Sequence, residues 1–130
     1  RILSELRGHS SPFLGNPNLG ARMDLSFYQL KAIQTAIYPD SERISYPAMG
    51  LAGEVGEVMN KIKKVYRDKG GKFDTDTKKA IASELGDVLW YLAVLSQDLG
   101  QGLEDIAASN LKKLQSRQER GTLSGSGDTR

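Results

Sequence analysis

The stretch AGEVGEV at residues 52–58 returns, almost unchanged, as ASELGDV at residues 82–88. Both stretches share one pattern: an acid, an apolar residue, glycine, a second acid and valine. Each lies in a longer segment in which apolar residues recur every three or four positions, which is typical of a helix with one buried side. The sequence therefore predicts two long helices. Their apolar positions are Leu51, Val55, Val58, Ile62 and Val65 in the first, and Ile81, Leu85, Val88, Leu92, Leu95 and Leu99 in the second.

Four helices are predicted in all, because no segment alternates apolar and polar residues for long enough to indicate a β-strand. Ser26, followed three residues later by Gln29, has the pattern of a capping box, and Gly70-Gly71 is a helix stop. The connecting loops are short, so neighbouring helices should run antiparallel. The predicted fold is all-α, an antiparallel helix bundle completed by oligomerisation. The helices should begin near residues 26, 45, 74 and 102 and end near residues 37, 68, 100 and 120.

The 130 residues suffice for one compact domain. Residues 1–22 are polar, contain proline and glycine, and have no apolar period. We interpret them as a poorly structured upstream leader, with Met23 as the natural start. Residues 23–120 form the predicted all-α domain. Residues 121–130, GTLSGSGDTR, are rich in glycine and serine and are predicted to be a flexible tail.

Composition argues against several classes of protein. The net charge is +2, and residues 1–22 hold three of the 18 basic and one of the 16 acidic residues, so residues 23–130 are neutral. That balance gives no electrostatic case for nucleic acid or a membrane surface as a partner. Without cysteine there is no disulfide and no thiolate metal site. The longest apolar stretch, residues 85–95, is interrupted by Asp87 and is too short to span a bilayer. We expect a cytoplasmic protein.

Each repeat places two carboxylates three residues apart, on one side of its helix and beside the apolar stripe. The acids are Glu54 and Glu57 in the first repeat, and Glu84 and Asp87 in the second. Glu57 lies 11 residues before the expected end of its helix, and Glu84 lies 10 after the start of the next. In an antiparallel pair the four carboxylates should therefore converge. Their mutual repulsion is relieved by a hard divalent cation with oxygen ligands, Mg²⁺ or Mn²⁺.

A glycine stands between the two acids of each repeat, at Gly56 and Gly86. Glycine inside a helix costs about 1 kcal/mol relative to alanine, so a close helix approach or space for a ligand would account for both. A Glu-x-x-Glu pair alone is also common on a solvated helix face. The second copy, at nearly the same distance from the turn, favours the metal site over that alternative.

These motifs resemble those of the MazG-like nucleoside triphosphate pyrophosphohydrolases, in the all-α NTP pyrophosphatase superfamily. The family pattern is Glu-x-x-Glu, a spacer, then Glu-x-x-Asp, and the spacer here has 26 residues. The similarity covers about residues 26–120 and includes YPAMGLAGE at residues 46–54, together with Tyr28-Gln29, Ala32 and Thr35-Ala36. It implies a Mg²⁺-dependent enzyme that cleaves an NTP or dNTP to the monophosphate and pyrophosphate. House-cleaning of non-standard nucleotides is the role that the resemblance suggests.

The resemblance also implies roles for individual residues. The four acids would hold Mg²⁺ and act in catalysis, with a metal-activated water attacking the α-phosphorus and Glu57 or Glu54 orienting it. Family members form homodimers or homotetramers, so sites should be completed across an interface. Phosphate contacts would come from Lys61, Asn110, Lys113 and Arg117. The candidates for base binding are Tyr28, Trp90 and Tyr91.

Several of these assignments have a structural alternative. Lys61 has the spacing of an i,i+4 partner of Glu57, Lys112 and Arg117 fit a solvated helix face, and aromatic residues at helical spacing often belong to a core or an interface. A phosphoribosyl-ATP pyrophosphohydrolase-like enzyme and a non-catalytic, metal-binding helical interaction module remain alternative functions. A di-iron bundle is disfavoured, because it normally uses Glu-x-x-His motifs and residues 23–130 contain no histidine.

Overall fold

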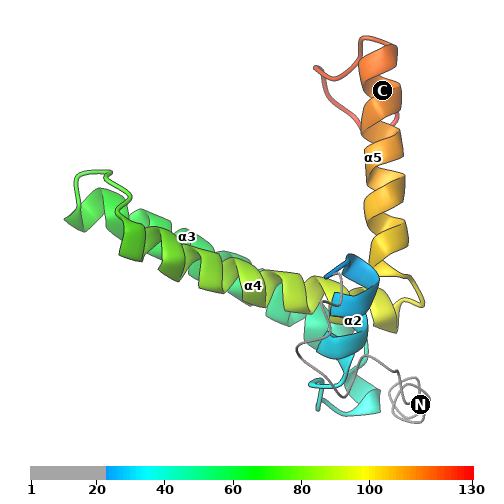
Figure 1. The fold of residues 1–130 in the computed structure, drawn as a ribbon, viewed down its shortest axis with the longest axis horizontal. Coiled ribbons are helices and arrows are strands. Elements are labelled where there is room, and N and C mark those ends of the chain that lie inside the picture. Colours follow the sequence, from blue (N-terminus) through cyan, green and yellow to red (C-terminus); the bar gives the residue numbers. More distant parts are fainter. Residues whose placement is uncertain (1–22) are drawn as a thin grey trace.

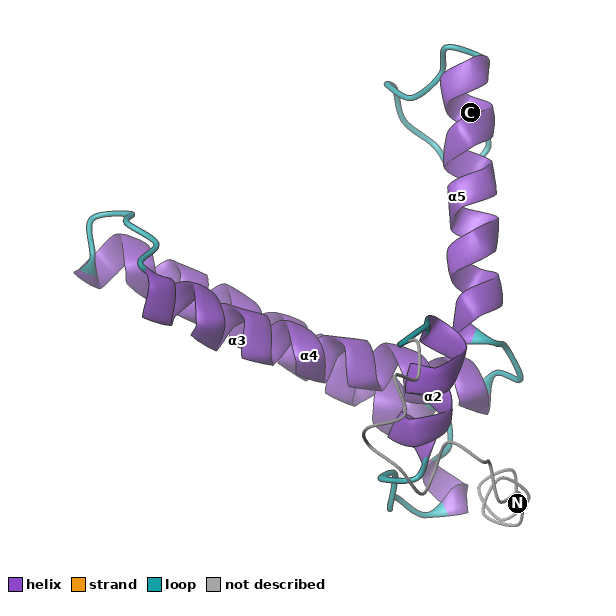
Figure 2. Cartoon of the chain, viewed as in Figure 1, coloured by secondary structure: helices purple, strands orange, loops and turns teal. Residues whose placement is uncertain are grey.

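A computed structural model describes residues 23–130, so the interpretation of residues 1–22 as a leader lies outside the described part. The described residues form helices and no β-strand, which confirms the predicted all-α fold (Figure 2). The observed ends of the last three α-helices lie within two residues of the predicted ones. The elements are α2 (Leu25–Ile33), the 3₁₀ helix η1 (Asp40–Glu42), α3 (Ser45–Asp68), α4 (Thr75–Asp98) and α5 (Leu103–Glu119).

Helices α3 and α4, of 24 residues each, form a long antiparallel hairpin (Figure 1). Local signals build the turn between them. Gly70 and Gly71 adopt positive φ values of 59° and 78°, and the amide of Gly71 donates to the carbonyl of Val65 at 3.2 Å, which closes α3. Asp74 then caps α4, because its carboxylate accepts from the amide of Thr77 at 2.8 Å.

Helix α2 crosses the end of the hairpin that lies away from this turn (Figure 1). The predicted capping box at its start is wrong. Asp24 is the N-cap and accepts from the amide of Phe27 at 2.7 Å. Gln29 is instead buried: its amide group donates to the carbonyls of Ala93 and Gln101, and its carbonyl oxygen accepts from the amide of Leu103 at 2.9 Å. Gln29 thus joins α2 to the end of α4 and the start of α5.

The buried core lies where α2 and the segment after it meet α4. Helix α2 ends at Ile33, four residues before the predicted end, and the chain then turns so that Ala36 and Tyr38 still face α4. Trp90 packs against both parts of this core. The buried core residues are Ala32, Ala93 and Leu103 in one cluster, and Ala36, Tyr38 and Val94 in the other.

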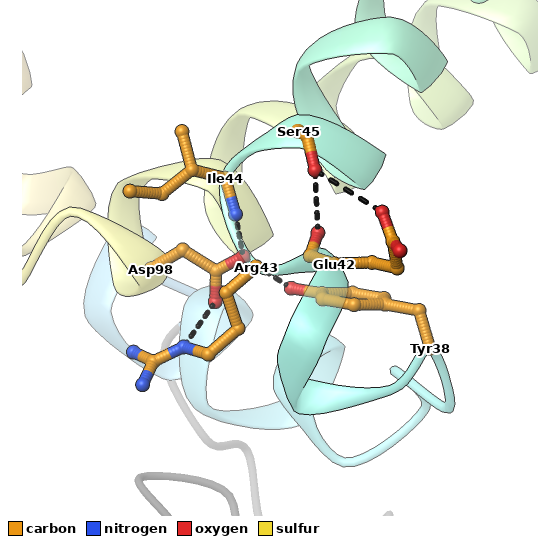
Figure 3. A network of polar contacts seen from close by, with 6 residues as sticks. All are labelled: Tyr38, Glu42, Arg43, Ile44, Ser45 and Asp98. Atoms are coloured by element: carbon orange, nitrogen blue, oxygen red, sulfur yellow. Dashed lines mark hydrogen bonds and ion pairs between the residues drawn. The ribbon is translucent and has the colours of Figure 1, made fainter.

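Asp98, at the end of α4, holds the connection into α3 in place (Figure 3). Its carboxylate accepts from the hydroxyl of Tyr38 at 2.7 Å and from the amide of Ile44 at 3.0 Å, and it pairs with Arg43 at 3.6 Å. Ile44 has a φ of 69°, which is strained for a β-branched residue. The amide of Ser45 donates to the carbonyl of Arg43 across this residue, which makes a tight γ-turn. The turn sets the direction in which α3 begins.

Helix α5 contacts α2 and α4 near its start and then extends away from the hairpin (Figure 1). Many apolar side chains therefore stay exposed on both the hairpin and α5, including Met59, Leu85, Ile106, Leu111 and Leu114. An exposed apolar surface of this kind commonly marks an interaction site. Completion of the bundle by oligomerisation stays a prediction. Among the described residues, no helix is long and apolar enough to cross a membrane.

The Asp98 network predicts a graded loss of stability. Asp98→Ala removes the oxygen that accepts from both Tyr38 and Ile44 and leaves these two donors without a partner, so the free energy of unfolding should fall by about 2 kcal/mol. Tyr38→Phe removes one hydrogen bond and should cost about 1 kcal/mol. Urea unfolding of both variants measures the difference. Wild-type stability in both would show that the network does not hold the connection.

Candidate metal centre

Three acids from two helices come together at the middle of the hairpin. Glu54 on α3 and Glu84 and Asp87 on α4 each offer a carboxylate oxygen, and the three oxygens lie within 4.8 Å of one another. The predicted meeting of the two repeats is thus present for three of the four acids. Glu57 is exposed and lies outside this group. Its role as a fourth ligand stays a prediction.

The neighbouring acids lie close enough to Glu54 to affect its ionisation. Burial raises the pKa of Glu54, and the negative charges of Asp87 and Glu84 raise that pKa further. One counter-charge is present, because the ammonium of Lys61 lies 3.3 Å from a carboxylate oxygen of Glu84. This is the ion pair that Lys61 makes, in place of the predicted pairing with Glu57. A cluster of carboxylate oxygens with a shortage of positive charge suits a hard divalent cation such as Mg²⁺ or Mn²⁺.

The glycines beside the acids do not serve close packing inside this chain. A Cβ added at Gly53, Gly56 or Gly86 would meet no atom within 4 Å among the described residues. The first explanation for the mid-helix glycines, a close approach of α3 and α4, is therefore wrong for the single chain. The second explanation, space beside the acids for a ligand, is consistent with this geometry.

Two of the three candidate base-binding residues border the acids. Burial raises the pKa of Tyr28, and the charge of Asp87 raises it further. Burial also raises the pKa of Tyr91, with contributions from Tyr46 and Glu54. Both hydroxyl groups are therefore near the carboxylates.

Trp90 faces the core instead. It lies against both core clusters and donates its indole N–H to the hydroxyl of Thr35 at 2.7 Å. The Tyr91 ring meets the Trp90 ring edge to face, with 4.9 Å between their centroids. Trp90 thus packs between the core and the Tyr91 ring.

Tyr46 and Gly50, in the first turns of α3, belong to this aromatic site although they were not among the predicted site residues. The Tyr46 ring stacks on Tyr38 with centroids 4.8 Å apart. The Tyr91 ring occupies the space where a side chain at position 50 would stand. The signal was present in the YPAMGLAGE segment, because a glycine in the second turn of a helix needs a reason.

The predicted phosphate ligands on α5 are not brought to the acids within one chain. Asn110 and Lys113 are exposed and lie midway along α5, which points away from the hairpin (Figure 1). Arg117 is buried, with 6% of its surface exposed, so the alternative of a solvated face is wrong for this residue. Its guanidinium donates to the carbonyl of Asp128 at 2.8 Å, and the tail thus folds back beside α5. The predicted flexibility of the tail stays a prediction.

Comparison with known proteins agrees with this geometry. The family model described as the MazG nucleotide pyrophosphohydrolase domain matches residues 46–122, which contain all four acids. A curated relative, the Gene 37 protein of Mycobacterium phage L5, is 46% identical over 114 residues. That match covers 83% of this chain and 100% of the relative. No solved structure is significantly similar to the chain.

The contact between Gly50 and Tyr91 predicts opposite effects for two neighbouring glycines. Gly50→Ala places a methyl group inside the Tyr91 ring position, so the ring must move and the free energy of unfolding should fall by about 1–2 kcal/mol. In Gly53→Ala the added methyl group meets no atom within 4 Å, so the free energy of unfolding should rise by up to about 1 kcal/mol. Urea unfolding and near-ultraviolet circular dichroism report both effects. A stabilised Gly50→Ala variant with an unchanged aromatic spectrum would contradict this account.

Proposed function

This chain belongs to the MazG nucleotide pyrophosphohydrolase family, and we propose that it hydrolyses nucleoside or deoxynucleoside triphosphates to the monophosphate and pyrophosphate, with Mg²⁺ as cofactor. The observation that carries the proposal is the meeting of Glu54, Glu84 and Asp87 within 4.8 Å. Uncompensated carboxylates at this spacing are unfavourable, and their oxygens are the ligands that Mg²⁺ prefers.

The proposed roles follow from position. Glu54, Glu84 and Asp87 hold the ion, and Glu57, exposed on the next turn of α3, is placed to approach it when a substrate is bound. The bound ion supplies positive charge to the phosphate oxygens and lowers the pKa of water. Glu57 or Glu54 orients the attacking water. Lys61, already paired with Glu84 at 3.3 Å, contributes a positive charge on the same side of the hairpin, where the triphosphate carries its negative charge.

The aromatic residues on the other side of the acids are proposed to receive the nucleoside. Burial raises the pKa values of Tyr28 and Tyr91, and the charge of Asp87 on the first and of Glu54 on the second adds to the effect, which is consistent with a position close to the acids. Stacking of a base on such a ring is worth about 1–3 kcal/mol and tolerates different bases. Trp90 acts here as the support behind Tyr91. Such a site suits a role in clearing non-standard nucleotides, which we propose as the biological use of the reaction.

We further propose that the working form is a homodimer or homotetramer. Asn110 and Lys113 lie on a helix that extends away from the acids of its own chain. In a symmetric assembly, α5 of one copy is free to lie against the hairpin of another. That arrangement would cover exposed apolar residues and bring an amide and an ammonium group to a bound triphosphate. No nucleic acid or membrane is needed as a partner.

Metal-dependent release of pyrophosphate tests the reaction. Wild-type protein should convert members of a panel of NTPs, dNTPs and phosphoribosyl-ATP to the monophosphate and pyrophosphate with Mg²⁺, and should convert none with a chelator. Glu84→Gln and Glu57→Gln should each lower kcat at least about a hundredfold, because both remove a negative charge next to the ion. Glu119→Gln, on the exposed end of α5, is the matched control and should retain wild-type activity.

The same assay distinguishes the alternatives. Turnover of phosphoribosyl-ATP alone would assign the chain to that branch of the superfamily. A folded protein that binds Mg²⁺ but cleaves no nucleotide would favour the non-catalytic interaction module and would contradict the proposal. Equal rates on standard and modified nucleotides would remove the house-cleaning role and leave the reaction intact.

The proposed assembly predicts a change in mass on substitution of α5. Light scattering coupled to gel filtration should give two or four times the chain mass of 14.2 kDa for wild type. Leu111→Glu, at a position with 68% of its surface exposed in the single chain, should shift the protein toward the monomer and lower activity in parallel. Gln118→Glu adds the same charge to an exposed site on the same helix and should do neither. A monomeric, active wild type would refute the assembly.

A further inference from the structure

A second polar feature lies on the hairpin between the acids and the 69–74 turn. It is an open pocket of about 270 Å³ between the second half of α3 and the first half of α4. Three lysines and two aspartates, Asp68 and Asp76, line it, and the site described above uses only the first of these lysines. The residues that matter for the argument are Lys61, Lys64 and Val65 on α3, and Thr77 and Ala80 on α4.

This pocket adjoins the metal centre. On α3, Glu54, Lys61 and Val65 follow one another at steps of seven and four residues, so they share one side of the helix. On α4, Glu84 and Ala80 are four residues apart and share a side in the same way. The Lys61–Glu84 ion pair crosses from one helix to the other at the boundary between the two regions. The pocket therefore adjoins the acids on one side of the hairpin, and Lys61 belongs to both; the acids and the adjoining pocket are together called the groove.

The groove changes sign along its length. At the acids the charge is negative, and toward the turn three lysines stand against two aspartates, Asp68 and Asp76. Asp68 receives two hydrogen bonds from its neighbour Arg67, at 2.7 and 2.8 Å. Lys69 is occupied by Asp74 and by the hydroxyl of Thr77.

Lys64 makes no ion pair within 4 Å among residues 23–130, although its charge helps to lower the pKa of Asp68. Side chains on a helix lean toward its N-terminus, so Lys61 and Lys64 lean from α3 toward the acids. Lys64 is seven residues beyond Glu57, about 10 Å along the helix axis. Because its side chain leans toward the acids, its ammonium group lies closer than that to a phosphate bound there. It is therefore the cation in the groove best placed to receive an anion.

We propose that the Lys61–Lys64 part of the groove binds the two terminal phosphates of the substrate, so that the triphosphate lies along the hairpin with its base toward α2. This inference rests on the proposed hydrolysis of triphosphates. The acids then hold the ion at the centre, Tyr28 and Tyr91 lie on the nucleoside side, and the lysines lie on the side of the leaving group. Water attacks the α-phosphorus, the bond to the bridging oxygen breaks, and pyrophosphate leaves toward the turn with the electron pair.

The orientation makes Lys64 specific for pyrophosphate over the monophosphate. In Lys64→Met, the inhibition constant of inorganic pyrophosphate and the KM of the triphosphate should both rise about tenfold, as for loss of a charge-assisted contact. The inhibition constant of the nucleoside monophosphate should stay within twofold of wild type. Lys64→Arg keeps the charge and should recover most of the lost pyrophosphate affinity.

Lys63→Met is the matched control. Lys63 neighbours Lys64 on α3, is exposed, contacts Asn60 at 3.1 Å and does not line the groove. It should leave both inhibition constants unchanged, and circular dichroism should show that all three variants are folded.

The outcomes separate the two proposals. If wild type releases pyrophosphate but Lys64→Met and Lys63→Met behave alike, the orientation is wrong and the hydrolysis stands. If Lys64→Met weakens the binding of the monophosphate as much as that of pyrophosphate, the lysine acts on the nucleoside side and the proposed orientation is also wrong. If wild type hydrolyses no nucleotide, the proposed function fails and this inference fails with it.

Discussion

The antiparallel register of α3 and α4 is the constraint on which the site depends. Local interactions fix where each helix meets the 69–74 turn: Gly71, with its positive φ, closes the end of α3, and Asp74 caps the start of α4. Glu54 lies 14 residues before the end of α3 and Asp87 lies 12 residues after the start of α4, so these two acids stand at nearly the same height above that turn, with Glu84 one helical turn nearer to it. A shift of one residue in either helix would rotate its acids by about 100° and separate them. A turn ten or more residues away thus determines the geometry of the metal centre.

That register has an energetic cost, which the chain offsets elsewhere. Burial and the charges of the neighbouring acids raise the pKa of Glu54, and glycine at 53, 56 and 86 weakens the helices that carry the acids. Helix α3 buries two of its 24 residues within this chain, Pro47 and Val65. The stabilising contacts gather instead at the far end of the hairpin, where Gln29 and Asp98 fasten α2 and the α2–α3 connection to α4. The site is therefore kept apart from the core that supports it.

The sequence allowed the long helices to be predicted because their ends carry strong local signals, such as Gly70-Gly71 and Asp74. The sequence was misleading at Gln29, where the spacing from Ser26 suggested a capping box. Gln29 instead hydrogen bonds to three buried or partly buried backbone groups, those of Ala93, Gln101 and Leu103. The acids were found through the repeat, while Glu57 lies outside the group formed by the other three. Helix α5 contacts α2 and α4 near its start and then extends away from the hairpin, so spacing alone was insufficient to place Asn110, Lys113 or Arg117.

One hairpin carries three chemically different regions in order: aromatic residues where α2 crosses, acids at the middle and lysines toward the turn. The order is meaningful because a nucleoside triphosphate has the same sequence of properties, an aromatic base, a metal-binding phosphate chain and a terminal negative charge. A structural role for the acids alone would explain neither the tyrosines that border them nor the basic groove on their other side. The correspondence supports a site that binds the base, the metal-bound phosphates and the terminal phosphates in this order along the hairpin. The apolar residues exposed on the hairpin support a second copy of the chain that packs against them.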